Sequence, residues 1–151
     1  MTKTHTLSRT LILARPIDEI FRFFEDAMNL EQITPDFLGF RVLTEPPIEM
    51  RAGTLIDYRI RLFGVPMKWR TLIESYDPPH MFVDTQIKGP YKLWHHTHRF
   101  RPMDNGTEMT DSVRYQIGFG PIGEIARSIF VKRTLMQIFD HRNRRITELL
   151  G

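Results

Sequence analysis

The feature that most constrains this chain is the spacing of its apolar residues, which recur at every second position over much of residues 37–115. Residues 54–63, TLIDYRIRLF, show this best, because Ile56, Tyr58 and Ile60 alternate with charged neighbours. Such alternation is typical of antiparallel strands with one covered face and one face in water. We predict strands at 38–45, 54–63, 67–74, 82–86, 91–101 and 107–117, separated by proline and glycine turns. The sheet then needs another element to cover its apolar face.

The C-terminal segment supplies that cover. Pro121 stands at a favourable first helical position, and apolar residues then recur at helical spacing as far as Leu150. The stripe consists of Ile122, Ile125, Ile129, Met136, Phe139, Ile146 and Leu150, widened by Phe130, Leu135, Ile138 and Leu149. We therefore predict one long helix over 121–150 that packs against the sheet.

The N-terminal segment predicts a strand followed by two short helices. Residues 4–13 combine threonines with branched apolar residues, as strands do. Residues 16–26 begin with a proline followed by acidic residues, and their apolar residues recur every three or four positions, which indicates an amphipathic helix. Asn29 is predicted to cap a second helix, which runs through Thr34 and ends at Pro35.

Length and composition fit one folded domain over residues 1–151, with 41% hydrophobic and 26% charged residues. The chain has no cysteine, which excludes disulfides, thiolate metal sites and thiol nucleophiles. No apolar run approaches the roughly 18 residues of a transmembrane helix, and no signal-peptide pattern is present, so we expect a cytoplasmic protein without integral membrane contact. The net charge is +3, and the basic residues are scattered along the chain apart from a short run at 141–145. We interpret that run as a solvated helix face and expect no nucleic-acid partner.

The order of elements, a strand, two short helices, six strands and a long helix, resembles the START-like (SRPBCC) or helix-grip superfamily. This superfamily includes lipid-transfer domains, pollen-allergen-like carriers and polyketide cyclase-like proteins. Three segments resemble a bacterial branch described as ligand-binding: NLEQITPDFLGFRVL at 29–43, FVDTQIKGPYKLWHHTHRF at 82–100 and GTEMTDSVRYQIGFGPIG at 106–123. The resemblance implies an α+β fold in which a curved antiparallel sheet of about seven strands wraps around the C-terminal helix. It also implies a ligand cavity between them, but no particular reaction.

Polar residues fall on the predicted inner face of the last strands. Residues 104–106, Asp-Asn-Gly, are a strong hairpin signal, and antiparallel counting from them sets the register. The predicted pairs are Phe100 with Met109, His98 with Asp111, His96 with Val113, and Trp94 with Tyr115. If the first pair faces the helix, the alternation of side chains turns His96, His98 and Asp111 inward as well. On the preceding strand, Asp84 shares a face with Phe82 and Gln86 in the same way.

Three interpretations of this inner polar set are open. It can be a structural network in which His98 donates to Asp111, because a buried polar group needs a partner. It can orient the polar head of a ligand whose apolar body contacts aromatic side chains. It can also act as acid and base in a cyclase- or dehydratase-like enzyme, with His98 or His96 beside Asp111 or Asp84. The predicted ligand-binding residues are Tyr58, Trp69, Asp84, Gln86, Trp94, His96, His98, Asp111 and Tyr115.

The histidines at 95, 96 and 98 also bear on metal binding. His95 points away from the other two on a strand, so at most His96 and His98 share an ion, with Asp111 as a third ligand. Their spacing follows trivially from strand alternation, and the superfamily that the chain resembles seldom uses metals. We therefore expect neither a metal nor a cofactor. The glycine-rich residues 118–123 lack the lysine of a phosphate loop and are interpreted as the hinge before the long helix.

The sequence thus predicts a module that binds a small hydrophobic or amphipathic molecule. The cyclase-like enzyme is the alternative. A third interpretation, an interaction partner of a larger enzyme, follows only from the epimerase-like domains found beside or fused to members of the branch. The ligand, the cavity volume and the oligomeric state stay open, with a homodimer among the states allowed.

Overall fold

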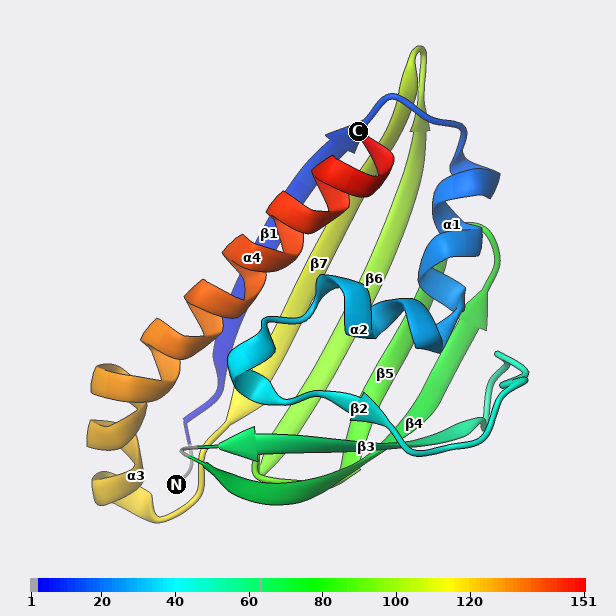
Figure 1. Cartoon of the computed structure of the whole chain (residues 1–151). Helices are drawn as coiled ribbons and strands as arrows, with labels where there is room; N and C mark the ends of the chain where they lie inside the picture. The colour runs from blue at the N-terminus through cyan, green and yellow to red at the C-terminus, as the bar shows by residue number, and fades with distance from the viewer. Residues whose placement is uncertain (1–2, 63) are drawn as a thin grey trace.

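The computed structural model describes residues 3–62 and 64–151 and confirms the predicted helix-grip fold. Seven antiparallel strands form one sheet in the order β1-β7-β6-β5-β4-β3-β2. The strands are β1 (His5–Leu13), β2 (Arg41–Val42), β3 (Leu55–Leu62), β4 (Val65–Asp77), β5 (Met81–Lys88), β6 (Leu93–Met103) and β7 (Gly106–Gln116). The sheet curves around the C-terminal helix, and the shorter helices cover the same side of it (Figure 1).

The helices fall into an N-terminal and a C-terminal group. Between β1 and β2 the chain forms α1 (Ile17–Glu25), η1 (Ala27–Asn29), α2 (Leu30–Ile33) and η2 (Asp36–Leu38). After β7 it forms α3 (Gly120–Ala126), the π-helical turn η3 (Arg127–Val131) and α4 (Lys132–Leu150). Helix α1 buries Phe21 and Phe24 against Phe100 of β6 and Met109 of β7, and this cluster is the main core. Fully burying side chains of this kind stabilises a fold by about 1.5–3 kcal/mol each.

The predicted register of the last hairpin is confirmed. Phe100 lies opposite Met109, and the other three predicted pairs of β6 and β7 are also present. Strand β1 pairs with the other edge of β7, so Leu11 lies opposite Met109 from that side. The alternation therefore directs His96, His98 and Asp111 inward, where all three are buried. The predicted strand over 54–63 is confirmed as far as Leu62, and its last position lies outside the described residues.

The predicted strand at 38–45 is wrong over most of its length. Its first residue belongs to the 3-10 helix η2, and only Arg41 and Val42 pair with β3. Gly39 ends the 3-10 turn in the left-handed region at φ 54°, a conformation that suits glycine and that strands do not use. The predicted capping bond of the second short helix is also wrong. Asn29 stands at the N-cap position of α2 but makes no side-chain capping bond, whereas Asp26 caps the preceding η1 by accepting from the Met28 amide at 3.0 Å.

The predicted long helix is interrupted by η3. A π-helical turn adds a residue to the turn, so an apolar stripe at regular helical spacing cannot stay on one face through it. Ile122, Ile125 and Ile129, before and within this turn, are 78%, 61% and 54% exposed. Beyond it, Leu135 and Phe139 of α4 are buried on the side of the helix that faces the sheet. No helix in the described part of the chain is long and apolar enough to cross a membrane.

Candidate functional site

A cavity of about 180 Å³ lies between the concave side of the sheet and the helices. Strands β3, β4, β5 and β6 contribute one wall, and α1, α2 and α4 contribute the opposite wall. Most lining side chains are apolar, for example Ile56 and Ile73 from the sheet and Leu135 from α4. Leu38 and Phe40, which flank Gly39, also line it. The departure of this segment from the sheet therefore brings two apolar side chains to the cavity.

Aromatic rings form a large part of the cavity wall. Trp69 and Trp94 meet edge to face with ring centroids 5.3 Å apart, and Tyr91 lies 4.8 Å from Trp94. On β3, Tyr58 packs at 4.9 Å against Phe40. Edge-to-face and tilted arrangements are those that aromatic pairs prefer. These rings give the wall an apolar, aromatic surface.

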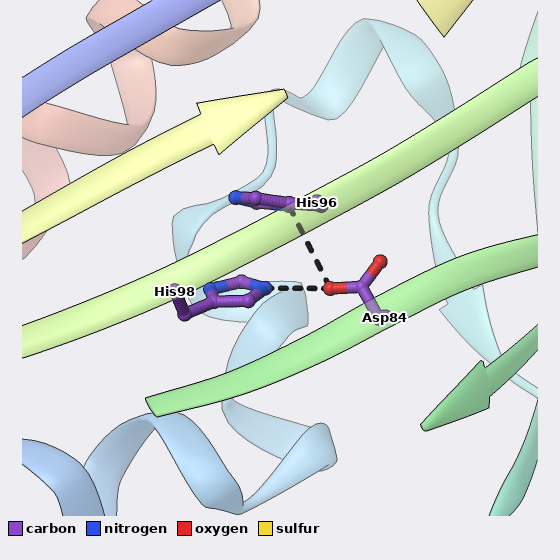
Figure 2. A group of neighbouring side chains, drawn as sticks. All are labelled: Asp84, His96 and His98. Atoms are coloured by element: carbon purple, nitrogen blue, oxygen red, sulfur yellow. Dashed lines mark hydrogen bonds and ion pairs between the residues drawn. The ribbon is translucent and has the colours of Figure 1, made fainter. Parts of the chain in front are cut away.

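Polar side chains gather at one place in the same wall (Figure 2). Asp84 of β5 and His96 of β6 lie opposite each other in the register, and His98 follows two residues later. His98 Nε2 donates to Asp84 Oδ2 at 2.5 Å, and His96 Nδ1 lies 3.6 Å from the same oxygen. The two imidazole rings stack with centroids 3.7 Å apart. All three residues line the cavity, so the cluster faces any molecule bound there.

Asp111 and Arg142 extend this cluster, Asp111 from behind the histidines and Arg142 from a position that also lines the cavity. His96 Nε2 donates to Asp111 Oδ1 at 2.8 Å. Arg142 of α4 donates to the same carboxylate through Nε at 3.0 Å and Nη2 at 3.2 Å. The guanidinium also lies 5.3 Å from the centre of the Phe24 ring. Asp111 thus connects β6, β7 and the C-terminal helix through buried, charge-assisted hydrogen bonds.

Burial and neighbouring charges set the protonation of the cluster. Burial and, to a smaller extent, the neighbouring His96 lower the pKa of His98 to about 4, although the Asp84 and Asp111 carboxylates oppose this shift. Burial by itself would raise the pKa of Asp84 and of Asp111. His96 and His98 nevertheless hold the pKa of Asp84 below its ordinary value, and Arg142 and His96 do the same for Asp111. Near neutral pH, two carboxylates therefore face one guanidinium and a neutral His98.

One nitrogen of the cluster is left unpaired. An ionised carboxylate only accepts hydrogen bonds, so Nε2 of each histidine carries the proton that it donates. Neutral His98 then has no proton on Nδ1, which is buried without a hydrogen-bond partner among the described residues. This nitrogen lies 3.4 Å from Asp111 Oδ1, so its lone pair faces an anionic oxygen. An unsatisfied buried polar atom costs about 1–3 kcal/mol, and the cluster is therefore not a fully satisfied network.

The structure brings six of the nine predicted ligand-binding residues to the cavity wall. These are Tyr58, Trp69, Asp84, Trp94, His96 and His98. Asp111 lies behind the histidines, as described above. Gln86 and Tyr115 do not line the cavity, because Gln86 bonds to the main chain of Tyr91 and Tyr115 is buried in the core. The outward position predicted for His95 fits its contact with Glu74, 3.2 Å away.

The predicted bond from His98 to Asp111 is wrong. The two residues are backbone partners, but the short hydrogen bonds run from His98 to Asp84 and from His96 to Asp111. The interpretation of residues 141–145 as a solvated face is also wrong for Arg142, which is 6% exposed. Its burial could have been predicted from its spacing, because it lies three residues after Phe139 and four before Ile146 on the buried stripe of α4. Tyr91 and Arg142 also line the cavity, although neither is among the predicted ligand-binding residues.

Known proteins share this fold. The aromatase/cyclase ZhuI from Streptomyces sp. R1128 superposes with a TM-score of 0.75 at 14% identity, covering 97% of this chain and 93% of that one. A START superfamily protein from Mycobacterium smegmatis superposes with a TM-score of 0.69 at 14% identity, covering 96% of this chain and 99% of that one. A point mutant of norcoclaurine synthase from Thalictrum flavum superposes with a TM-score of 0.64 at 16% identity, covering 98% of this chain and 97% of that one. Identities this low show the fold alone.

The sequence itself also matches a family. No curated protein matches the chain. The family model described as polyketide cyclase/dehydrase and lipid transport matches residues 13–140, which is most of the chain. The chain therefore belongs to the polyketide cyclase/dehydrase and lipid transport family.

Proposed function

We propose that this protein binds a small amphipathic molecule in the cavity, with the polar group of the molecule at Asp84 and the histidines. The observation that carries the proposal is the combination of an apolar, aromatic wall with one polar cluster. Cavities of this composition are the usual form of small-molecule sites, in which a few polar groups fix the orientation of an apolar ligand.

The cavity volume limits the size of the ligand. An apolar cavity of about 150 Å³ is known to hold benzene. At about 180 Å³, this cavity has room for a slightly larger molecule, such as a substituted single ring. The tilted rings of Trp69, Trp94 and Tyr91 offer edges and faces to such a ring. A compact aromatic or alicyclic molecule therefore fits better than a long lipid chain.

The charges of the cluster favour a ligand that donates a hydrogen bond. Asp84 uses Oδ2 for His98, which leaves Oδ1 as an acceptor on a side chain that is 18% exposed. Because Asp84 keeps a lowered pKa, this oxygen is anionic near neutral pH. A hydroxyl or phenol group can donate to it, whereas a carboxylate ligand would meet two anionic side chains and one guanidinium. A neutral alcohol or phenol is therefore the proposed ligand class.

Calorimetric titration with p-cresol and p-xylene tests this proposal, because the two probes differ only by a hydroxyl in place of a methyl group. Hydrogen bonds to charged groups contribute about 1.5–3 kcal/mol, against about 0.5–1.5 for neutral ones. Asp84→Asn should therefore weaken p-cresol binding about fivefold relative to p-xylene. Asp57→Asn, on the outer face of β3, should leave the ratio unchanged. The proposal is wrong if neither probe binds saturably, or if the two variants change the ratio equally.

The second candidate is a cyclase- or dehydratase-like enzyme. It is favoured by one observation, that an imidazole hydrogen-bonded to a carboxylate lines the cavity at His98 and Asp84. Such a pair can pass a proton to or from a bound substrate. Replacement of both His96 and His98 should then abolish turnover of a substrate while its affinity stays within a fewfold. If affinity and turnover fall together, or the variant is unfolded by circular dichroism, the enzyme proposal is not supported.

A further inference from the structure

We propose that Asp84, His96 and His98 form a binding site for a divalent metal ion, with an open coordination position towards the cavity. The ligating atoms are Asp84 Oδ2, His96 Nδ1 and His98 Nε2, and Figure 2 shows both imidazoles beside the carboxylate. The ligand atoms that the three residues offer lie within 4.8 Å of one another. This departs from the expectation of a metal-free site, because the third ligand is Asp84 of β5, whereas the sequence suggested Asp111.

One of two distances between the ligating atoms matches the spacing that a metal ion requires, and the other needs to lengthen. Zinc lies about 2.0–2.2 Å from histidine nitrogen and carboxylate oxygen, so neighbouring ligand atoms in a tetrahedral site lie about 3.4 Å apart. His96 Nδ1 and Asp84 Oδ2 are 3.6 Å apart, which matches that spacing. His98 Nε2 and Asp84 Oδ2 are 2.5 Å apart and need to separate by about 1 Å. Rotation of the partly exposed Asp84 side chain can supply this change without moving the strands.

The groups behind the histidines are those that support metal-binding histidines elsewhere. A ligating histidine usually donates its second ring N–H to a carboxylate, which fixes the orientation of the ring. His96 donates Nε2–H to Asp111 at 2.8 Å, and His98 Nδ1 lies 3.4 Å from the same oxygen. Arg142 holds that carboxylate with two hydrogen bonds. One anchored carboxylate therefore faces the far nitrogen of both imidazoles.

A metal ion would also satisfy the unpaired nitrogen of His98. Binding at Nε2 moves the single ring proton to Nδ1, which then points at Asp111 Oδ1 and can donate to it. His96 Nδ1, which lies 3.6 Å from Asp84 Oδ2, becomes a metal ligand in the same step. The proton that leaves His98 Nε2 is taken up at Nδ1 of the same ring, and the hydrogen bond from Nε2 to Asp84 Oδ2 is replaced by the bonds of both atoms to the ion. The metal-bound arrangement therefore gives the unpaired His98 Nδ1 a hydrogen-bond partner in Asp111.

The donor set indicates the class of ion. Two imidazoles and one carboxylate with open positions suit Zn²⁺ or Fe²⁺, whereas Ca²⁺ and Mg²⁺ prefer sites built of oxygen ligands. The carboxylates of Asp84 and Asp111 also favour an added cation. The proposal stands on the side-chain cluster alone and does not depend on which small molecule the cavity binds.

The test is a titration of the chelator-treated full chain with Zn²⁺ by calorimetry and with Co²⁺ by visible absorption. One ion should bind per chain, and Co²⁺ should show the absorption bands of a site with nitrogen ligands. His98→Ala should weaken binding more than a hundredfold, and Asp111→Asn roughly 10–100-fold, the usual cost of losing an outer-shell partner. His95→Ala, on the other face of β6, should have no effect.

Near-ultraviolet circular dichroism must show that each variant is folded. If His98→Ala does not fold, Asp84→Asn decides, because asparagine still accepts the hydrogen bond of His98 but is a weaker metal ligand. Failure of the chain to bind either ion overturns the proposal. So does an equal loss in His95→Ala, which would assign the ion to the surface pair of His95 and Glu74. Neither result would affect the binding of p-cresol, so the two proposals fail independently.

Discussion

Replacement of Arg142 by methionine should destabilise the protein strongly, because it leaves the buried charge of Asp111 without its cation. The two side chains are 8% and 3% exposed and share two hydrogen bonds. Breaking a buried pair by removing one partner typically costs about 3–5 kcal/mol. For a domain of this length each kcal/mol lowers the melting temperature by about 2–4 °C, so Arg142→Met should melt roughly 10 °C lower.

The assay is urea unfolding followed by circular dichroism, supported by thermal melts. Arg144→Met is the matched control, because Arg144 is exposed on the same helix, and its free energy of unfolding should change by no more than about 0.5 kcal/mol. Adding Asp111→Asn to Arg142→Met should restore part of the lost stability, since the unpaired charge is then gone. A loss below about 1 kcal/mol in Arg142→Met, or a double variant less stable than the single one, would refute this reasoning.

Three further predictions concern stability. In the presence of a chelator, the free energy of unfolding should fall by on the order of 3 kcal/mol between pH 6.5 and 4, because unfolded His98 gains a proton that the folded chain binds only near pH 4. Urea titrations at each pH should show a shallower fall in His98→Gln. Ile146→Ala should cost about 2–5 kcal/mol at a fully buried position, while Met136→Ala, 42% exposed on the same helix, should change little; equal losses would contradict the packing of α4. Gly123→Ala should lower the melting temperature, because its Cβ would lie 1.8 Å from the Gly118 carbonyl oxygen, and an unchanged melt would contradict that close approach.

The sheet register could be predicted from sequence because two independent signals agree. The Asp-Asn-Gly turn at 104–106 fixes one end of the hairpin, and strict alternation carries the register along both strands as far as Trp94 and Tyr115. The inward direction of His96, His98 and Asp111 follows from the same counting. No comparable signal fixed the segment at 38–45, where a glycine in the left-handed region took the chain out of the sheet.

The hydrogen-bond partners within the cluster could not be predicted in this way. Backbone pairing places His98 opposite Asp111 on one side and Phe82 on the other. Side chains in a strand lean along the strand direction, so the nearest carboxylate need not be the backbone partner. In this sheet His98 reaches Asp84 and stacks on Phe82 with centroids 4.0 Å apart, while His96 reaches Asp111.

The burial of Arg142 and the position of the π-helical turn were not predicted from the sequence, for two different reasons. Arg142 lies at helical spacing between Phe139 and Ile146, so the pattern contained its burial, but its charged neighbours suggested a solvated face. A buried arginine requires an anionic partner, and that partner, Asp111, lies on a distant strand. The turn at η3 leaves no mark on the spacing of apolar residues, so the exposure of Ile125 and Ile129 could not be predicted.

The most direct test of the central claim is a crystal structure of the protein soaked with p-cresol. We expect the ring in the cavity between Trp94 and the apolar residues of α4, with the hydroxyl within hydrogen-bond distance of Asp84. This expectation would be contradicted by a cavity filled with protein side chains. It would equally be contradicted by p-cresol bound in the cavity with its hydroxyl turned away from Asp84 and the two histidines.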